Sequence, residues 1–270
     1  MDKINLNTIA QEPIQGHSSK GDQPKWHLDG KWYKADHMGY EALSEVLVSR
    51  LLMKSNVTEF VTYAPVLICY QEKEVAGCVS ESFQGKDEML IPFERLHRAY
   101  KGRGLAKVLS GFAEPQERIR YTVDFVENFT GLRDVGPYLT MILELDALFL
   151  NEDRHTNNLA ILRNENTLEF RLCPVFDNGL ALLSDTNDYP EDEDVYNCIS
   201  RVQAKPFDRE FLTQVDAAEE LYGIQLKLSF SRNDVAEELK ALSELYGSKI
   251  CHRVESILLE QMRKYAYLFR

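Results

Sequence analysis

Three polar residues near the middle of the chain have the types and spacing that phosphoryl transfer requires. Asp153 is followed five residues later by Asn158, and Asp177 begins an Asp-Asn-Gly segment further along. A carboxylate can accept the proton of an attacking hydroxyl, and amide and carboxylate oxygens can hold Mg²⁺ against nucleotide phosphates. We therefore predict Asp153 as the catalytic base, and Asn158 and Asp177 as ligands of Mg²⁺ and, with it, of ATP.

The sequence between these residues indicates how they would meet. Residues 159–162 and 168–172 are rich in apolar side chains and flank the turn-forming run 164–166, so they are predicted to form a β-hairpin. Asp177 follows this hairpin closely. Taken singly, Asp153 and Asp177 each also fit a turn or a helix cap; together, with a hairpin between them, they favour catalysis.

His155 lies in the same loop as Asp153 and is another side chain with the acid–base properties of a general base near neutral pH. We interpret it instead as a residue that organises the loop by hydrogen bonding to the backbone. Asn157, the neighbour of Asn158, is expected to point elsewhere.

Nucleotide phosphates also need backbone amides and a lysine, and the N-terminal part of the chain offers both. The amide-rich loop consists of Ser18, Ser19, Lys20 and Gly21. Lys34 lies at the end of a predicted strand and is the candidate phosphate-binding lysine, although a lone lysine there also fits an exposed position. An acidic residue of the following helix should hold it. Glu41 and Glu45 lie one turn apart on the same side of that helix, and we predict Glu41.

The elements that would position these groups change in kind along the chain. Residues 1–15 are expected to be a flexible or loosely docked lead-in. Residues 26–28 and 31–34, joined by Asp-Gly, are predicted to form a hairpin. Apolar residues at three- and four-residue spacing predict a helix over 39–53. The short apolar runs 60–63, 66–70 and 75–79 are predicted strands of a small mixed sheet.

From about residue 85 onward the sequence is expected to be mainly helical. Gly136-Pro137 precedes an apolar segment that predicts a buried helix over 138–150, with the proline at its first position. Further helices are predicted near 208–222, 233–246 and 249–268. Ser231 and Asp234 have the spacing of a capping box for the second of these.

Composition narrows the classes of protein. The chain has 270 residues and a formal net charge of -12, which disfavours a nucleic-acid partner because phosphate binding needs a basic face. Its five cysteines show no paired spacing, which indicates reduced thiols in a cytoplasmic setting. No stretch approaches the roughly 20 apolar residues of a membrane span, and the first residues lack the apolar core of a signal peptide. We therefore expect a cytoplasmic protein with no membrane partner.

The motifs together resemble the HipA-like serine/threonine kinases, the kinase toxins of bacterial toxin–antitoxin systems and their relatives. The resemblance rests on Ser18-x-x-Gly21-Asp22-Gln23-Pro24-Lys25, on Lys34, on Asn151-x-Asp153-x-His155-x-x-Asn158 and on Asp177-x-Gly179. It implies an α+β, bilobal protein-kinase-like fold, with a small mixed β-sheet in an N-lobe over 16–84 and a mainly helical C-lobe over 85–270. The Asp-Arg-His-x-x-Asn form also resembles the catalytic loop of phosphoinositide-type lipid kinases.

The same resemblance assigns roles to residues. It implies Asp153 as the base, Asn158 and Asp177 as Mg²⁺ ligands, Lys34 on the phosphates of ATP, and adenine at a hinge near Glu81 and Phe83. In these kinases the loop serine can be autophosphorylated, which switches the enzyme off; the matching position is Ser18, where a turn serine without a regulatory role is the alternative. The chain is shorter than full-length HipA-type toxins, a departure that bears on the toxin role more than on the chemistry; the resemblance also implies an antitoxin-like partner.

The expected function is therefore an ATP- and Mg²⁺-dependent kinase acting on serine or threonine of a protein substrate. A lipid or small-molecule kinase remains an alternative because the catalytic loop does not define the acceptor. A second alternative is a nucleotide-binding pseudokinase or scaffold, although the sequence retains the lysine, the base and the metal ligands that a kinase requires. The run 185–194 contains six acidic residues that would either attract a basic substrate or form a solvated loop.

Overall fold

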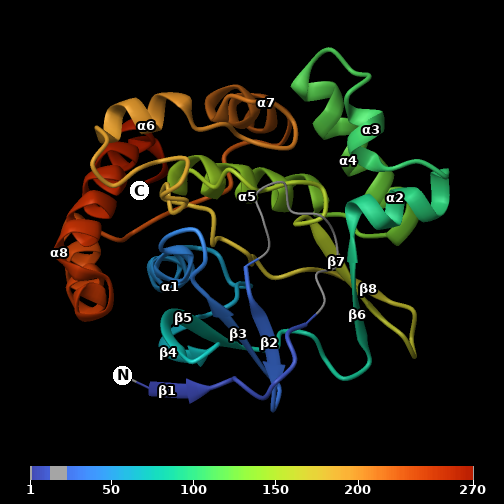
Figure 1. Ribbon diagram of the computed structural model, residues 1–270. Coiled ribbons are helices and arrows are strands. Elements are labelled where there is room, and N and C mark those ends of the chain that lie inside the picture. Colours follow the sequence, from blue (N-terminus) through green and yellow to red (C-terminus); the bar gives the residue numbers. More distant parts are fainter. Residues whose placement is uncertain (1, 13–22, 270) are drawn as a thin grey trace.

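Two β-sheets and a set of helices make up the computed structural model, which describes residues 2–12 and 23–269 (Figure 1). The strands are β1 (Asp2–Asn5), β2 (Lys25–Leu28), β3 (Lys31–Ala35), β4 (Ala64–Tyr70), β5 (Lys73–Glu81), β6 (Glu88–Pro92), β7 (Ala160–Asn164) and β8 (Phe170–Leu172). The helices are α1 (Glu41–Leu52), α2 (Phe93–Lys101), α3 (Leu105–Leu109), α4 (Pro115–Thr130), α5 (Val135–Phe149), α6 (Val195–Arg201), α7 (Phe211–Tyr222), α8 (Arg232–Lys264) and the short 3-10 helix η1 (Ala266–Leu268). This mixture of helices and sheets confirms the α+β class.

The first sheet is mixed and has the order β1-β4-β5-β3-β2. The predicted hairpin is confirmed: β2 and β3 pair antiparallel, and Asp29 and Gly30 in the turn have φ of 50° and 77°, the left-handed values that such a tight turn needs. The predicted strands at 66–70 and 75–79 are confirmed within β4 and β5, which pair antiparallel.

The start of the chain corrects one expectation. The sequence predicts a flexible or loosely docked lead-in over 1–15, yet within its described residues β1 pairs parallel with β4, from Asp2 opposite Val66 to Asn5 opposite Cys69. Leu6, directly after β1, is only 1% exposed. A short polar strand gives little signal on its own, because its stability comes from an edge supplied by residues about 60 positions later.

α1 confirms the helix predicted over 39–53 and lies between the sheet and α8 (Figure 1). Eleven of its twelve residues are buried, because neighbours cover it on several sides. Asp36 accepts a hydrogen bond from the backbone N–H of Ala42 at 2.6 Å and one from the hydroxyl of Tyr246 at 2.9 Å. The start of α1 is thereby joined to the far end of the first arm of α8.

The second sheet has the order β6-β7-β8 and contains one strand that sequence reasoning missed. The hairpin predicted at 159–162 and 168–172 is confirmed as β7 and β8, but β6 adds to it in the region expected to be mainly helical. Residues 60–63 are not a strand; Phe60 makes only an isolated bridge with Val175. Both errors have the same cause, because pairing with distant residues determines whether such a short apolar run forms a strand.

The helical part is built around α5, thirteen of whose fifteen residues are buried (Figure 1). The helix begins at Val135, so Pro137 is its third residue and not its first as predicted; a first-turn position still tolerates the missing N–H. The helices predicted near 208–222, 233–246 and 249–268 correspond to α7 and to the two arms of α8, which bends at Gly247. The capping box of Ser231 and Asp234 is confirmed.

The acidic run 185–194 is largely used within the fold. Asp194 caps α6 by accepting from the N–H groups of Tyr196 and Asn197, and Glu191 pairs with Lys249 at 3.2 Å. Among the described residues, no helix combines the length and apolar character required to cross a bilayer.

Gly77 in β5 allows the sheet to close tightly behind Lys34. A Cβ atom at this position would lie 2.6 Å from the backbone oxygen of Lys34 and 2.4 Å from Cδ1 of Ile68. Gly77→Ala should therefore lower the free energy of unfolding by about 1–3 kcal/mol, measured by urea denaturation. Gly85→Ala is the matched control because its new Cβ meets only the flexible Glu88 side chain. Equal midpoints for both variants and wild type would contradict the tight approach.

Candidate active site

Lys34 is the centre of the candidate site. Its ammonium group forms ion pairs with the carboxylate of Glu45, from α1, and with Oδ1 of Asp177 at 2.8 Å, although Lys34 is only 8% exposed. Tyr63 lies beside it, with the ring centroid 5.3 Å from the ammonium. A strand lysine predicted to bind phosphates thus meets a predicted metal ligand 143 residues away in the sequence.

These contacts fix the charges of the pair. Burial alone would lower the pKa of Lys34, but Asp177 and Glu45 raise it well above its usual value. Burial would raise the pKa of Asp177, but Lys34, Lys25 and Arg154 together hold it well below the ordinary value of an aspartate. Both groups are therefore ionised at neutral pH, which suits one to bind phosphate and the other to bind a cation.

The prediction that Glu41 holds Lys34 is wrong, since Glu45 forms that ion pair. The Glu41 carboxylate turns back and accepts hydrogen bonds from the backbone N–H groups of Met38 at 2.7 Å and Gly39 at 3.0 Å. Because α1 begins at Glu41, its side chain meets the free amides that precede the helix, and Glu45, one turn later, reaches β3. The sequence contains both acids, but only the residue at which the helix starts determines which of them reaches Lys34.

Lys25 is a second lysine of this region, to which sequence reasoning gave no separate role. It lies directly opposite Lys34 in the antiparallel pair of β2 and β3, so both side chains lie on one face of the sheet. Its charge lowers the pKa of Asp177. Two neighbouring lysines favour an anion such as a phosphate group.

Asp153 and Asn158 lie in the loop that follows α5. The side-chain amide nitrogen of Asn158 donates to the backbone oxygen of Asp153 at 3.0 Å, and the N–H of Asp153 is bound by Oδ1 of Asn151 at 3.2 Å. The loop is thus held by its own asparagines. In this orientation the amide oxygen of Asn158 is the atom available to a metal.

Arg154 joins this loop to the segment that carries Asp177. It is 1% exposed, and its guanidinium binds both carboxylate oxygens of Asp146 at 3.0 Å. It also donates to the backbone oxygen of Phe176 at 2.8 Å and to Oδ1 of Asn178 at 2.9 Å. The two predicted metal ligands are therefore carried by segments that share one buried cation.

The Asp-Asn-Gly turn is also tied to α1. The backbone N–H of Asn178 donates to Oε2 of Glu45 at 2.8 Å, while Oε1 of Glu45 holds Lys34. Asp177 itself has a φ of 61°, a left-handed conformation that aspartate tolerates better than most residues. Glu45 thereby links β3, α1 and the turn through one carboxylate.

His155 differs from its predicted role as a side chain that binds the backbone. Its Nε2 lies 3.7 Å from Oδ2 of Asp153, too long for a hydrogen bond, and its buried Nδ1 has no hydrogen-bond partner among the described residues. Only its backbone organises the loop, with the N–H donating to the oxygen of Asp153 at 2.8 Å.

The residues predicted for the nucleotide itself are only partly described. Ser18, Ser19, Lys20 and Gly21 lie outside the described residues. Glu81 is at the end of β5, where Lys31 pairs with it at 3.3 Å on the surface. Phe83 packs against Phe176, with ring centroids 5.4 Å apart, so the predicted hinge contacts the residue before Asp177.

The donor set fits Mg²⁺, since an amide oxygen and an ionised carboxylate are the hard oxygen ligands that this ion takes together with substrate phosphates. Asn158 offers its oxygen because its nitrogen is used, and Asp177 is kept ionised by its lysines. Both observations agree with the predicted roles, which remain predictions.

Lys205 is a residue at the site that sequence reasoning missed. Its ammonium group lies 3.2 Å from Oδ1 of Asp153. It comes from the segment between α6 and α7, 52 residues from Asp153, and no motif marks it. Its place became visible only through the fold.

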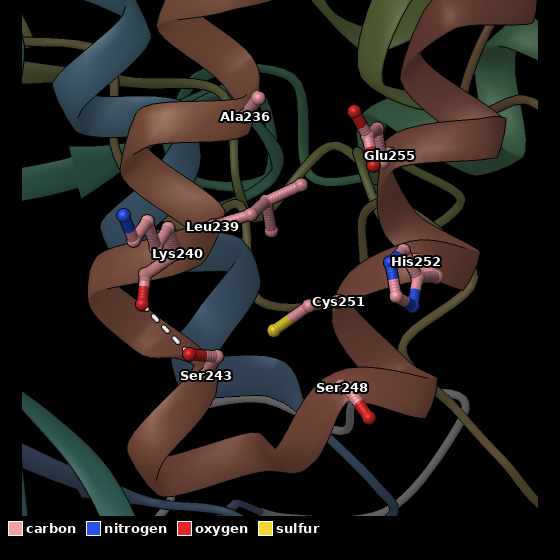
Figure 2. Close-up of a pocket in the computed structure, with 8 residues that line it drawn as sticks. All are labelled: Ala236, Leu239, Lys240, Ser243, Ser248, Cys251, His252 and Glu255. Carbon is pink, nitrogen blue, oxygen red and sulfur yellow. Dashed lines mark hydrogen bonds between the residues drawn. The ribbon is translucent and has the colours of Figure 1, made fainter.

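A separate pocket of about 210 Å³ lies between the two arms of α8, lined by Leu239, Cys251 and His252 among others (Figure 2). Lys34, Asp153 and Asp177 do not line it. It is therefore distinct from the site built around Lys34.

The fold is kinase-like, as similarity to solved structures shows. Among solved structures, the chain is similar to a Helicobacter pylori proinflammatory kinase, CtkA, with a TM-score of 0.63 and 16% identity over 97% of this chain and 94% of that one. It is also similar to HipA in the Shewanella oneidensis MR-1 toxin–antitoxin complex of HipA, HipB and operator DNA, with a TM-score of 0.50 and 11% identity.

That second match covers 93% of this chain and 66% of the HipA chain. The comparison confirms, at the level of the fold, the resemblance to HipA-like kinases that the motifs indicated. Searches against protein-family models and against curated proteins gave no significant match.

Arg154 and Asp146 form a buried pair whose two members should be strongly interdependent. Arg154→Met leaves the carboxylate of Asp146 buried without its cation, so the free energy of unfolding should fall by about 3–5 kcal/mol. In the double variant Arg154→Met/Asp146→Leu, the charge is removed and much of that loss should be recovered. Urea denaturation of the four proteins in the cycle measures the coupling; additive losses would contradict it.

Proposed function

We propose that this protein is an ATP- and Mg²⁺-dependent kinase that transfers a phosphoryl group to a serine or threonine hydroxyl of a protein. The observation that carries the proposal is the carboxylate of Glu45, which joins Lys34 to the turn of Asp177 and Asn178. This contact supports a shared site for the proposed phosphate-binding lysine and the proposed metal-binding aspartate, which are 143 residues apart in the sequence. The similarity to two kinase structures supports the same class of reaction.

The residues of the chain divide the work. Asp153 accepts the proton of the acceptor hydroxyl, which needs a carboxylate within hydrogen-bond reach of that group. Lys34 and Lys25 bind phosphate oxygens from the sheet side. Asn158 and Asp177 would hold Mg²⁺, which neutralises phosphate charge when it is bound. Arg154 keeps the segments of Asp153 and Asp177 together.

The finer parts of the proposal rest on the resemblance. A protein acceptor, ATP seated near Glu81 and Phe83, self-phosphorylation at Ser18 and an antitoxin-like partner are properties of the HipA-like kinases that the motifs resemble. One similar structure is a HipA toxin with its HipB partner and operator DNA, which supports a search for a partner of this chain.

The role of Asp153 is tested by Asp153→Asn. We expect phosphoryl transfer from γ-labelled ATP to fall by about 100-fold or more, because the amide cannot take the proton. Affinity for ATP·Mg²⁺, measured by calorimetry, should change little. Mass spectrometry of the labelled wild-type protein would show whether Ser18 is an acceptor. Transfer at the wild-type rate in the variant would exclude Asp153 as the base.

The correction from Glu41 to Glu45 gives a second test. Glu45→Gln removes one of the two counter-charges of Lys34 and weakens its link to Asn178, so the Kd for ATP·Mg²⁺ should rise about tenfold. Glu41→Gln is the matched control, since it removes the same charge one turn away and touches only the loop amides. It should lower thermal stability and shift the Kd far less. A larger loss of affinity in Glu41→Gln would reverse the assignment.

A further inference from the structure

The segment between α6 and α7 brings one lysine to the predicted base. The ammonium of Lys205 lies 3.2 Å from Oδ1 of Asp153, and the side chains of the two residues are 33% and 11% exposed. Lys34 makes its ion pairs elsewhere, with Glu45 and Asp177. Separate lysines therefore accompany the predicted base and the predicted metal ligand.

The backbone around Lys205 is held by side chains from two helices. Its own carbonyl oxygen accepts from Nε2 of Gln214, a fully buried residue of α7, at 3.3 Å. The carbonyl oxygen of Phe207 accepts from Arg118 of α4 at 2.6 Å, and the Phe207 ring is fully buried. Ala204 and Arg209 close the segment with a backbone hydrogen bond of 2.8 Å. The position of Lys205 is thus set by the core of the helical part.

The distance to Asp153 decides what this lysine can reach. In phosphoryl transfer the hydroxyl oxygen forms a bond to the γ-phosphorus, and the bond from phosphorus to the bridging oxygen breaks. Its electron pair leaves with ADP, and the hydroxyl proton passes to the base. The base must therefore touch the hydroxyl that attacks phosphorus. A flexible ammonium in contact with that carboxylate is also within reach of the phosphoryl oxygens, whose negative charge attracts it.

We propose that Lys205 is a catalytic residue that binds the γ-phosphoryl group of the bound nucleotide and stays with it during transfer. The proposal rests on the proposed kinase function. In it, Lys34 and Lys25 approach the nucleotide from the sheet, and Lys205 approaches from the helical part on the side of Asp153. The cation carried by the segment after α6 completes the neutralisation of charge at the acceptor end.

The test compares Lys205→Met with Lys205→Arg and with Lys249→Met. Lys249 is the matched control because it forms an ion pair of the same length, 3.2 Å, with Glu191 and is not part of the site. Three quantities are measured for each protein: the single-turnover rate of phosphoryl transfer from γ-labelled ATP, the calorimetric Kd for ATP·Mg²⁺ and the calorimetric Kd for ADP·Mg²⁺. Thermal unfolding confirms that each variant is folded.

For Lys205→Met we expect the transfer rate to fall roughly 100-fold, as for loss of one preorganised donor. Its Kd for ATP·Mg²⁺ should rise roughly tenfold while that for ADP·Mg²⁺ stays unchanged, because only ATP carries the γ-phosphoryl group. Lys205→Arg should recover part of both losses, and Lys249→Met should match wild type.

Two outcomes would overturn the inference and leave the kinase function standing. In one, Lys205→Met transfers at the wild-type rate. In the other, its rate falls but ATP and ADP affinities change equally or not at all, which would make Lys205 a residue that only positions Asp153 or its own segment. Failure of the kinase function is a different result: the wild-type protein itself would neither bind ATP·Mg²⁺ nor transfer its phosphate.

Discussion

The buried guanidinium of Arg154 is the constraint on which the rest of the site depends. A cation that is 1% exposed must have its charge and its donors satisfied inside the protein. Asp146 of α5 provides the charge, and the Phe176 carbonyl and the Asn178 side chain accept further hydrogen bonds. Satisfying one side chain thus fixes the end of α5, the loop of Asp153 and the turn of Asp177 relative to one another.

The sheet side is attached to this core through a second charged group. Glu45 accepts from Lys34 and from the N–H of Asn178, so α1, β3 and the Asp-Asn-Gly turn meet at one carboxylate. Arg154 and Glu45 both contact Asn178. That residue, the unspecified middle position of the sequence motif, is therefore the point where the two halves of the site join.

Much of this could be predicted from sequence where the signal is local. The Asp-Gly hairpin, the helix over 39–53, the hairpin between Asp153 and Asp177, and the capping box depend on neighbouring residues and are confirmed. Most of the failures concern distant partners. β1 and β6 pair with strands far along the chain, and Lys205 reaches Asp153 only through the packing of α6 and α7. The choice of Glu45 over Glu41 depends instead on the residue at which α1 starts.

The burial of α1 has a consequence for control of activity. A kinase can be switched by swinging the helix that carries the lysine's acidic partner, but that motion is inexpensive only if one face of the helix is loosely held. Here eleven of the twelve residues of α1 are buried, and Arg50 pairs with Glu238 of α8. The hydroxyl of Tyr246 also donates a hydrogen bond to Asp36, next to the start of α1. Displacing α1 would expose buried apolar surface to water on two sides of the helix at once. In the proposed kinase, α1 would therefore keep Glu45 at Lys34, and regulation would act on what enters the site and not on how the site is assembled.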